Sequence, residues 1–339
     1  MRSACQVGRV TVPRDPQSVC AVVATFNRKE LLAECLDALL AQTHSLDRIF
    51  VIDNASTDGT LELLRERGFL ARPELEHVRL EANRGGTGGF AAGIEAGREA
   101  GCDWIWIMDD DAEPSPDCLE LLLASEHADD PFTAALCPAV VLPDGTVDIK
   151  HRGLFRRRPR YLPREEYAPG TSPRLEFFTW VGLLLRSRVA RAAGLPKAEF
   201  FIWADDYEYS FRVREHGELR LVPGARIVHK DVGQGYENRR SRFWNRLTRW
   251  DLDPVPIEDF WRNLCGVRNY LWLKKRYERQ SALSAVGTTA QFMLKSLLYD
   301  ERPLRRLPWI VRFARDGRRD IFRTFGPREW TAIVRPGKS

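Results

Sequence analysis

An apolar run that ends in three consecutive carboxylates, Asp109-Asp110-Asp111, is the feature that most constrains how this chain can fold. The run, residues 104–108, reads Trp-Ile-Trp-Ile-Met and is typical of a buried strand. Pro114 and Pro116 follow, and proline lacks the N–H that a strand ladder needs, so we expect the strand to end at the carboxylates. Open α/β sheets bind ligands at the carboxyl ends of their strands, which places the triplet where a binding site is expected.

Three adjacent negative charges at such a position repel one another unless something positive compensates them. Their oxygen atoms favour hard cations such as Mg²⁺ or Mn²⁺, which in turn hold phosphates. The alternative is an acidic turn that caps the following helix. The triplet alone leaves both interpretations open.

Strand and helix patterns alternate before the triplet. Apolar runs at 19–24 and 49–52 predict buried strands, and helical periodicity follows each of them, from Lys29 and from the turn at 56–60. This alternation implies parallel strands joined by right-handed crossovers, and therefore an α/β fold.

A glycine-rich segment, Asn83-Arg84-Gly85-Gly86-Thr87-Gly88-Gly89-Phe90, follows a short strand expected at 77–80 and precedes a helix expected from Ala91. Glycines there would let the backbone approach a ligand and present N–H groups to an anion. The spacing differs from a dinucleotide-binding fingerprint, which belongs to the first strand–helix turn. The glycines could instead serve only close packing.

The second half of this region predicts a strand at 133–142, a long surface excursion at 150–175 and another strand at 177–186. A pair of strands, 219–222 and 226–228, is expected around Pro223-Gly224, with His229 directly after it. Between these lies the acidic cluster Asp205-Asp206-Tyr207-Glu208, at the start of a helix. Acids at a helix start can reflect the helix dipole alone.

Charge is unevenly distributed along the 339 residues. From Arg239 onward there are 23 Lys+Arg against 10 Asp+Glu, whereas the first 238 residues have 29 against 37. The last third also carries tryptophans and helical periodicity, so we expect basic helices there that meet an anionic surface, or that are merely solvated or contact another subunit.

The seven cysteines are scattered without a CxxC pair, which favours reduced thiols in a cytoplasmic protein. Neither an apolar core of signal-peptide length nor about 18 uninterrupted apolar residues occurs. We therefore expect a cytoplasmic protein, peripheral at the inner face of the cytoplasmic membrane if it is attached at all.

Six segments together resemble glycosyltransferase family 2, whose members have the GT-A fold. They run in the family's order from Val19 to about Asp231: VVATFNRKELLAECLDALLAQT, VIDNASTDGT, NRGGTGGF, WIWIMDDDAEP, FIWADDYEYSFRVREHG and VPGARIVHK. Within the family, the glycine segment, the Asp triplet and the later Asp-Asp pair are most similar to bacterial galactofuranosyltransferases and related rhamnosyltransferases.

The resemblance implies a fold and a domain organisation. The fold is α/β, with a mixed, mostly parallel sheet flanked by helices and a C-terminal helical extension. The expected divisions are an N-terminal lead-in at 1–18, a GT-A catalytic domain at 19–235 and a basic, Trp-rich helical region at 236–339.

The resemblance also assigns site residues. Asp109, Asp111 and His229 would bind Mn²⁺ or Mg²⁺. The nucleotide-sugar would contact residues at the first, second and fourth strand ends and in the glycine segment: Thr25, Asn27, Arg28, Asp53, Asn54, Asn83, Gly85, Gly86, Gly88, Gly89 and Asp110. A carboxylate at Asp53 could accept a hydrogen bond from a pyrimidine N–H.

An acceptor hydroxyl that attacks the anomeric carbon must lose a proton, which requires a carboxylate base. We assign this to Asp206, with Asp205 binding acceptor hydroxyls and Glu208 completing the cluster. Direct displacement with one base inverts the anomeric configuration. Trp180 and Trp203 are candidates for packing on sugar rings, or for the core.

The function expected is a metal-dependent inverting glycosyltransferase. It would move galactofuranose or rhamnose from a UDP- or dTDP-sugar to a glycan or polyprenyl-linked glycan in cell-envelope polysaccharide synthesis, with an anionic membrane surface as a further partner and no nucleic acid. The oligomeric state stays open. One alternative is a sugar-nucleotide nucleotidyltransferase, although no glycine follows the first strand. Another is a non-catalytic nucleic-acid-binding protein that uses the basic tail.

Overall fold

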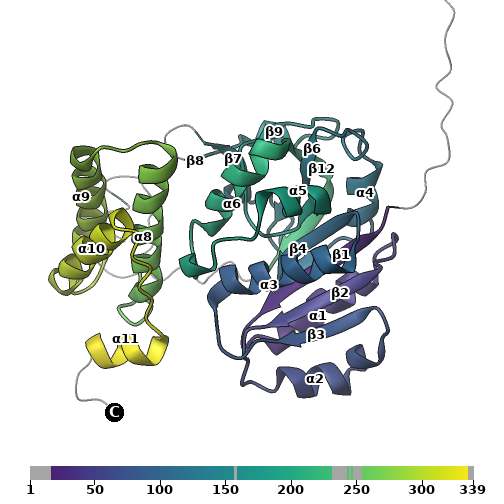
Figure 1. The fold of residues 1–339 in the computed structure, drawn as a ribbon, viewed down its shortest axis with the longest axis horizontal. Coiled ribbons are helices and arrows are strands. Elements are labelled where there is room, and N and C mark those ends of the chain that lie inside the picture. Colours follow the sequence, from purple (N-terminus) through teal and green to yellow (C-terminus); the bar gives the residue numbers. More distant parts are fainter. Residues whose placement is uncertain (1–16, 156–158, 231–242, 244–245, 247–253, 335–339) are drawn as a thin grey trace, which may run out of the picture.

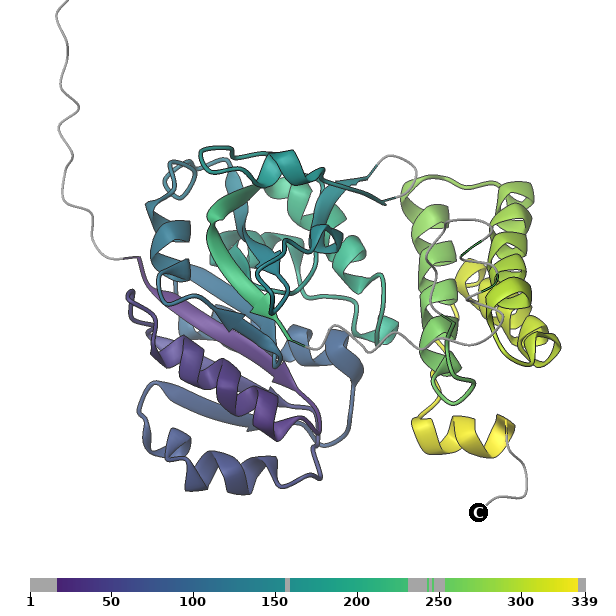
Figure 2. The same ribbon diagram turned by 180° about the vertical axis from the view of Figure 1, so that it is seen from behind.

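The computed structural model describes residues 17–155, 159–230, 243, 246 and 254–334. A sheet with helices on both faces forms one part of the molecule, and a group of helices from the C-terminal third stands beside it (Figure 1, and from behind in Figure 2). The lead-in up to residue 16, Arg156 to Arg158 and the expected boundary at 235/236 lie outside the described residues.

The strands of the first part alternate with helices as the sequence predicts. The strands are β1 (Val19–Thr25), β2 (Arg48–Asp53), β3 (Leu75–Arg79), β4 (Trp104–Asp109), β5 (Ala112–Pro114), β6 (Thr133–Val141), β7 (Arg152–Phe155), β8 (Pro159–Tyr161), β9 (Arg174–Leu175), β10 (Phe177–Phe178), β11 (Leu183–Arg186) and β12 (Glu218–His229). The helices are α1 (Lys29–Leu40), α2 (Thr60–Glu66), α3 (Gly85–Ala100), α4 (Cys118–Ala124), α5 (Ser187–Ala193) and α6 (Asp205–Val213).

The main sheet has the strand order β3-β2-β1-β4-β11-β6-β12-β5, with β9 also paired to β12. The first four strands in this order are parallel, and β11 runs antiparallel between β4 and β6. The mixed, mostly parallel sheet is therefore confirmed. Because β1, β2 and β4 are parallel neighbours, their carboxyl ends meet at one edge.

Alternate side chains of the strands pack on opposite faces. Val19, Ala21 and Val23 of β1 belong to one buried cluster with residues of α1 and α4. Cys20 and Val22 belong to the other, with residues of α3, α5 and α6. The sheet is thus covered on both sides, which explains why all seven residues of β1 are buried.

The strand at 104–108 ends at the carboxylates as predicted, because β4 stops at Asp109. Residues 112–114 nevertheless form a further short strand, β5, which tolerates Pro114 because it pairs only with β12 at the sheet edge. Two local predictions were wrong. The expected pair of strands around Pro223-Gly224 is a single strand, β12, with a bulge between Val222 and Arg226. The expected strand at 177–186 is divided between two sheets, at Gly182, whose φ is +76°.

The expected surface excursion at 150–175 is also more ordered than predicted. It contains β7 and β8, which form a small sheet with β10, and the side chain of Arg152 is completely buried. That guanidinium donates to the carbonyls of Pro138 and Val181. An arginine that satisfies backbone carbonyls in the interior is not distinguishable in sequence from a solvated one.

The expectation of uniformly reduced thiols was wrong as well. Cys20 and Cys102 form a disulfide across 82 residues of sequence, while the other described cysteines are free and buried. The pairing of Val19 with Trp104 between β1 and β4 brings the two cysteines side by side, which no spacing rule reveals. The cysteine pattern therefore gives no support to a reducing compartment.

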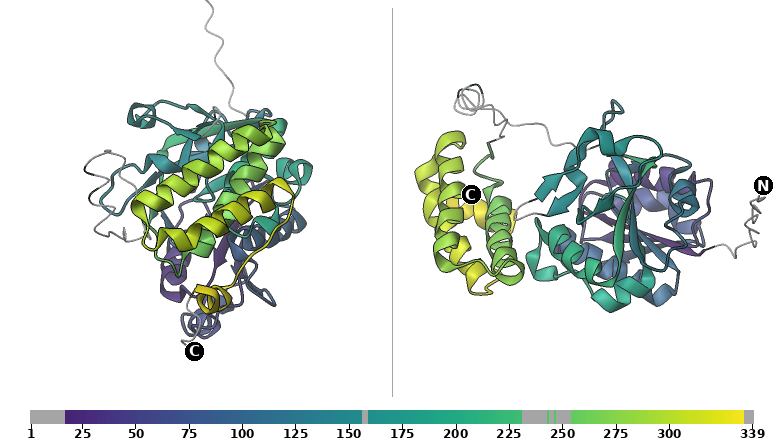
Figure 3. Two further views of the ribbon diagram at one scale, coloured as in Figure 1. Left: turned by 90° about the vertical axis from the view of Figure 1, so that its left-hand side faces the viewer. Right: turned by 90° about the horizontal axis from the view of Figure 1, so that it is seen from above.

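The C-terminal third is helical, as predicted. It contains α8 (Phe260–Tyr277), α9 (Ala282–Tyr299), α10 (Pro303–Arg318) and α11 (Pro327–Val334). These helices share a core of their own, in which Trp261 and Trp330 are buried. Helix α8 faces the part that contains the main sheet, and α9 and α10 lie beyond α8 (Figure 3). Within the described residues, no helix combines the length and apolar character needed to cross a bilayer.

Candidate active site

The Asp triplet lies at the end of β4, as predicted, and meets one arginine from the neighbouring strand end. Arg28 follows β1, and its two terminal nitrogens lie 3.1 Å from Asp110 Oδ1 and 2.7 Å from Asp111 Oδ2. Thr25, the last residue of β1, donates to Asp110 Oδ2 at 2.7 Å. Thr25 and Arg28, which the sequence predicted to contact the nucleotide, thus also contact the triplet directly.

His229, which lies far from the triplet in sequence, reaches it because β12 pairs with β5. The register places His229 opposite Ala112, the residue after the triplet. His229 Nε2 lies 3.3 Å from Asp111 Oδ1. Ligand atoms of Asp109, Asp111 and His229 all lie within 4.8 Å of one another, which is the set predicted from the sequence.

The positive groups around the triplet are too few to balance the negative charges of its three carboxylates. Burial and the repulsion of Asp111 raise the pKa of Asp109 to about 7. Burial likewise raises the pKa of Asp110 to about 6, although Arg28 and Thr25 oppose it. For Asp111, burial is outweighed by contacts with His229 and Arg28, which lower the pKa of the carboxyl. A site of this kind gains most from a bound cation.

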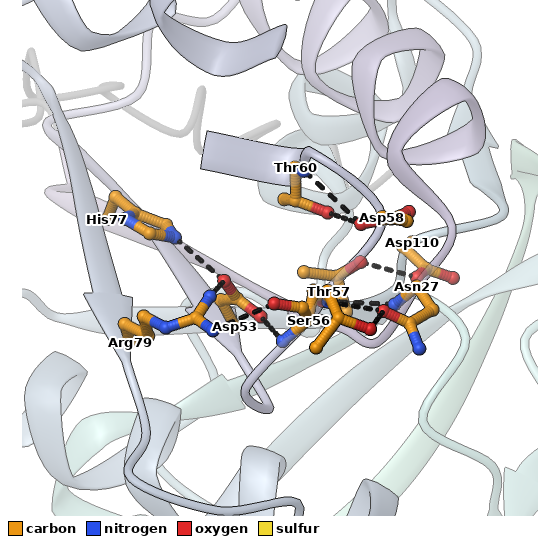
Figure 4. Close-up of polar contacts among 10 residues, drawn as sticks. Asn27, Asp53, Ser56, Thr57, Asp58, Thr60, His77, Arg79 and Asp110 are labelled. Carbon is orange, nitrogen blue, oxygen red and sulfur yellow. Dashed lines mark hydrogen bonds and ion pairs between the residues drawn. The ribbon is translucent and has the colours of Figure 1, made fainter. Parts of the chain in front are cut away.

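The loops after β1 and β2 are tied together by hydrogen bonds (Figure 4). The backbone N–H of Asn27 donates to Ser56 Oγ at 3.0 Å, and that of Thr57 donates to Asn27 Oδ1 at 2.7 Å. Asn27 has a φ of +53°, so this predicted nucleotide contact adopts a strained backbone that the loop stabilises.

Asp53 is completely buried at the end of β2. Its carboxylate accepts from the N–H of Ser56 at 2.7 Å and from Arg79 at 2.8 Å, and His77 Nε2 lies 3.3 Å away. Although burial opposes the charged form, these contacts lower the pKa of Asp53 to about 2. Its burial and its contacts with Arg79 and His77 were not indicated by the sequence.

The glycine segment does not form a loop before the helix, because α3 begins at Gly85 rather than at Ala91. Gly89 packs on the sheet, where a Cβ would lie 2.6 Å from the side-chain nitrogen Nδ2 of Asn54. Gly85 has a φ of +74°, and its Cβ would lie 2.1 Å from the carbonyl oxygen of Phe201. Close packing thus explains these two glycines, and Asn83 accepts from the Gly85 N–H at 2.8 Å.

The acidic cluster opens α6, but its members have different surroundings. Asp205 is buried and accepts from Trp180 Nε1 at 2.9 Å. Asp206 is half-buried, and burial together with the charge of Asp205 raises the pKa of Asp206 well above its ordinary value. Glu208 is buried and forms a two-point ion pair with Arg212, at 2.9 and 2.6 Å.

The two predicted sugar-stacking tryptophans are also unlike. Trp180 is in the core, where its ring stacks on Phe90 with centroids 4.6 Å apart. Trp203 is 55% exposed and precedes α6 directly. Only Trp203 therefore offers a ring face to a ligand in this structure.

Two residues that the sequence analysis missed hold the segment before α6. Phe201, Trp203 and Ala204 all have positive φ values, 67°, 70° and 64°. Asn269 of α8 donates to the carbonyls of Phe200, Ile202 and Trp203 at 3.0, 3.0 and 2.8 Å, and Arg268 donates to those of Glu199 and Phe200. Their signal in the sequence is a polar pair within the apolar periodicity of α8.

Comparisons with known proteins decide the family. A model described as "Glycosyl transferase family 2" matches residues 20–190, which is half of the chain.

The chain belongs to glycosyltransferase family 2.

It is 31% identical over 205 residues to the galactofuranosyltransferase GlfT1 of Mycolicibacterium smegmatis, a match that covers 59% of this chain and 66% of that relative. The GlfT1 protein of Mycobacterium tuberculosis is 32% identical over 209 residues, with the same coverage. The matches thus span just under two thirds of these relatives' length.

Solved structures show the fold. GalNAc-T7 with UDP, GalNAc and Mn²⁺ superposes with a TM-score of 0.60 at 14% identity, covering 95% of this chain and 57% of that one. Staphylococcus aureus TarS gives 0.50 at 14% identity, covering 91% and 94%. The family 2 enzyme therefore has the predicted GT-A fold with C-terminal helices, and family membership favours a glycosyltransferase over both alternative functions.

Proposed function

We propose that this family 2 enzyme transfers galactofuranose, or a similar sugar such as rhamnose, from a UDP- or dTDP-sugar to a glycan or polyprenyl-linked glycan during cell-envelope polysaccharide synthesis, with inversion. The observation that carries the proposal is the Asp109–Asp111–His229 cluster in a chain whose relatives include the galactofuranosyltransferases GlfT1. Two carboxylates beside a nucleotide-binding sheet edge suit a diphosphate-bearing donor.

The residues of the cluster fit a divalent cation. Asp111 Oδ1 has the 3.3 Å contact with His229 Nε2 but no well-aligned hydrogen bond, and His229 Nδ1 is buried without a hydrogen-bond partner among the described residues. The cluster therefore keeps atoms that could bind a cation. Carboxylate oxygen and neutral imidazole are both ligands of Mn²⁺, and the oxygens also suit Mg²⁺. When bound, such a cation supplies charge neutralisation for the departing diphosphate.

Donor binding would use the ends of β1 and β2. Thr25 and Arg28 orient Asp110 beside the cluster. Asn27 stabilises the loop after β2 through its hydrogen bond with Thr57. Asp53 and Asn54 are buried under this loop, so we propose that they shape the nucleoside pocket, with Arg79 as the exposed group that adjusts to the base.

Asp206 is the proposed general base, because it is the member of the α6 cluster that is both accessible and raised in pKa. As the acceptor oxygen bonds to the anomeric carbon, its proton passes to the Asp206 carboxylate. The bond from the anomeric carbon to the diphosphate oxygen breaks, and the nucleoside diphosphate leaves with that electron pair. Asp205 and Glu208, which have Trp180 and Arg212 as partners, position α6, while Trp203 packs on the acceptor sugar.

The outer helices offer a surface for an anionic membrane. On α9 the exposed side chains include Leu283, Val286 and Leu294. On α10, which lies beside α9 (Figure 3), Arg312 and Arg315 are exposed. Apolar side chains next to arginines favour an interfacial location, and we propose peripheral attachment at the cytoplasmic face. Flotation of the full chain with anionic liposomes tests this, and recovery in the soluble fraction would count against it.

A donor panel tests the function. UDP-galactofuranose, UDP-galactopyranose and dTDP-rhamnose are each incubated with Mn²⁺ or with EDTA, with and without a rhamnosyl or galactofuranosyl acceptor. Metal-dependent transfer from one furanosyl or rhamnosyl donor supports the proposal. Turnover of none of the donors, or equal turnover in EDTA, would refute it.

A further inference from the structure

A cavity of about 300 Å³ lies between the start of α6 and the C-terminal helices. Trp203, Ala204 and Tyr207 form its wall on the side of the catalytic domain. Gly266 of α8 and Phe292 of α9 are among the residues that close the other side. The cavity therefore adjoins the residues on either side of Asp205 and Asp206, where the acceptor is proposed to bind.

The lining is mainly aromatic and aliphatic, with few polar groups. Such a wall suits a hydrocarbon chain better than a sugar, which needs many hydrogen-bond partners. Two polar side chains of the lining, Ser296 and Lys295, nevertheless have atoms that could still bind a ligand. Ser296 is 2% exposed, and its Oγ has no hydrogen-bond partner among the described residues.

Lys295, next to it in α9, also lines the cavity and forms no ion pair with any residue that the structure describes. The one carboxylate of the lining, Asp300, already has a partner. Its oxygens accept from the N–H of Val255 at 3.1 Å and lie 3.4 Å from the buried Arg306. The cavity thus combines an apolar wall with a cation and a hydroxyl that have no ion-pair or hydrogen-bond partner among the described residues.

We propose that this cavity binds the apolar chain of the acceptor together with an anionic group, such as a phosphate, that joins the chain to the glycan. This inference rests on the proposed function, since it assigns the carrier end of that reaction's acceptor. Lys295 and Ser296 contact the anionic group, and Trp203 separates the chain from the sugar that approaches Asp206. The cavity holds only the first part of a long chain.

Gly266 provides a way to fill the cavity without disturbing the helix. A Cβ there would lie 3.6 Å from Trp203 Cβ, an ordinary contact, and its backbone is helical. Gly266→Leu should therefore fold, with improved helix propensity, and occupy the cavity. Gly287→Leu in α9 is the matched control, because nothing lies within 4 Å of a Cβ at that position.

The test is calorimetric binding of decyl phosphate, below its micelle concentration, to the full chain. We expect one site, a loss of about tenfold or more in Gly266→Leu, and wild-type affinity in Gly287→Leu. Lys295→Gln should lose about tenfold for decyl phosphate and bind decanol as the wild type does, since a charge-assisted contact is lost. Circular dichroism confirms that each variant is folded.

Absence of binding, equal binding to Gly266→Leu, or equal binding of inorganic phosphate alone would each overturn the inference. These outcomes do not depend on turnover, so they differ from failure of the proposed function, which the donor panel reports. If the enzyme transfers sugar but decyl phosphate does not bind, only the cavity assignment is wrong.

Discussion

Arg28 follows β1, Asp110 and Asp111 follow β4, and their side chains meet because β1 pairs with β4. The segment Phe200–Trp203, by contrast, is fixed by Asn269, which follows it by 66 to 69 residues in sequence and belongs to another group of helices. We call the strand ends, where we propose that the donor binds, the donor side. Residues 200–206, where we propose that the acceptor binds, are the acceptor side. The donor side is thus built by the sheet itself, whereas the acceptor side depends on the C-terminal helices.

This difference predicts that substitutions on the two sides will separate donor binding from transfer. The largest effect is expected at Asp111. Asp111→Asn should lower transfer about 1000-fold, because several kcal/mol of charge stabilisation are lost with the cation. Initial rates at saturating Mn²⁺ measure it, with Asp144→Asn in an exposed turn as the control that keeps activity. A loss under tenfold would show that the cation is bound elsewhere.

Asp206→Asn should lower the transfer rate about 100- to 10,000-fold while leaving UDP affinity within a factor of about two, since it removes only the base.

Burial and Asp205 raise the pKa of Asp206, and the base acts only when deprotonated. The wild-type kcat should therefore rise with pH above the ordinary titration range of an aspartate. A profile that is already flat at pH 5 would contradict this assignment.

Asn269→Ala should lower kcat by about 10- to 100-fold, because three backbone carbonyls lose their donor and the strained segment relaxes. Asn269 acts as a positioning residue, so UDP affinity should stay unchanged and Asn269→Gln should restore part of the rate. Leu271→Ala, in the core of the same helices, is the control for destabilisation alone. Equal losses in both variants would reduce Asn269 to a structural role.

The smallest effect concerns stability on the donor side. The pKa of Asp53 is lowered from 3.8 to about 2, so its charged form stabilises the fold by about 2 kcal/mol at neutral pH. This contribution is complete above about pH 4 and is lost as pH falls through 2. Urea unfolding of wild type and Asp53→Asn should therefore differ at pH 7 and converge near pH 2. If the two free energies of unfolding differ by the same amount at every pH, the charge of Asp53 does not contribute to stability.

The sequence predicted the donor side well because strand ends follow from local apolar runs, and Asp109, Asp111 and His229 are brought together as expected. It failed where tertiary contacts decide the structure. The Cys20–Cys102 disulfide, the buried Arg152 and the partners of Asp53 all depend on residues distant in sequence. Residues Arg268 and Asn269 look like ordinary surface positions until α8 is docked. The start of α3 was placed at Ala91 instead of Gly85, because glycines are poor helix formers and favour a loop prediction.

The most direct test of this account is calorimetric binding of UDP to the wild type, Asp111→Asn and Asn269→Ala, each with Mn²⁺ and with EDTA. We predict that Mn²⁺ strengthens UDP binding about tenfold or more in the wild type and in Asn269→Ala, and has no effect in Asp111→Asn. The assignment of the cation and the donor to the strand ends would be contradicted by either of two results. One is a wild-type UDP affinity that is the same with Mn²⁺ and with EDTA, and the other is an Asp111→Asn variant whose UDP affinity depends on Mn²⁺ as much as that of the wild type.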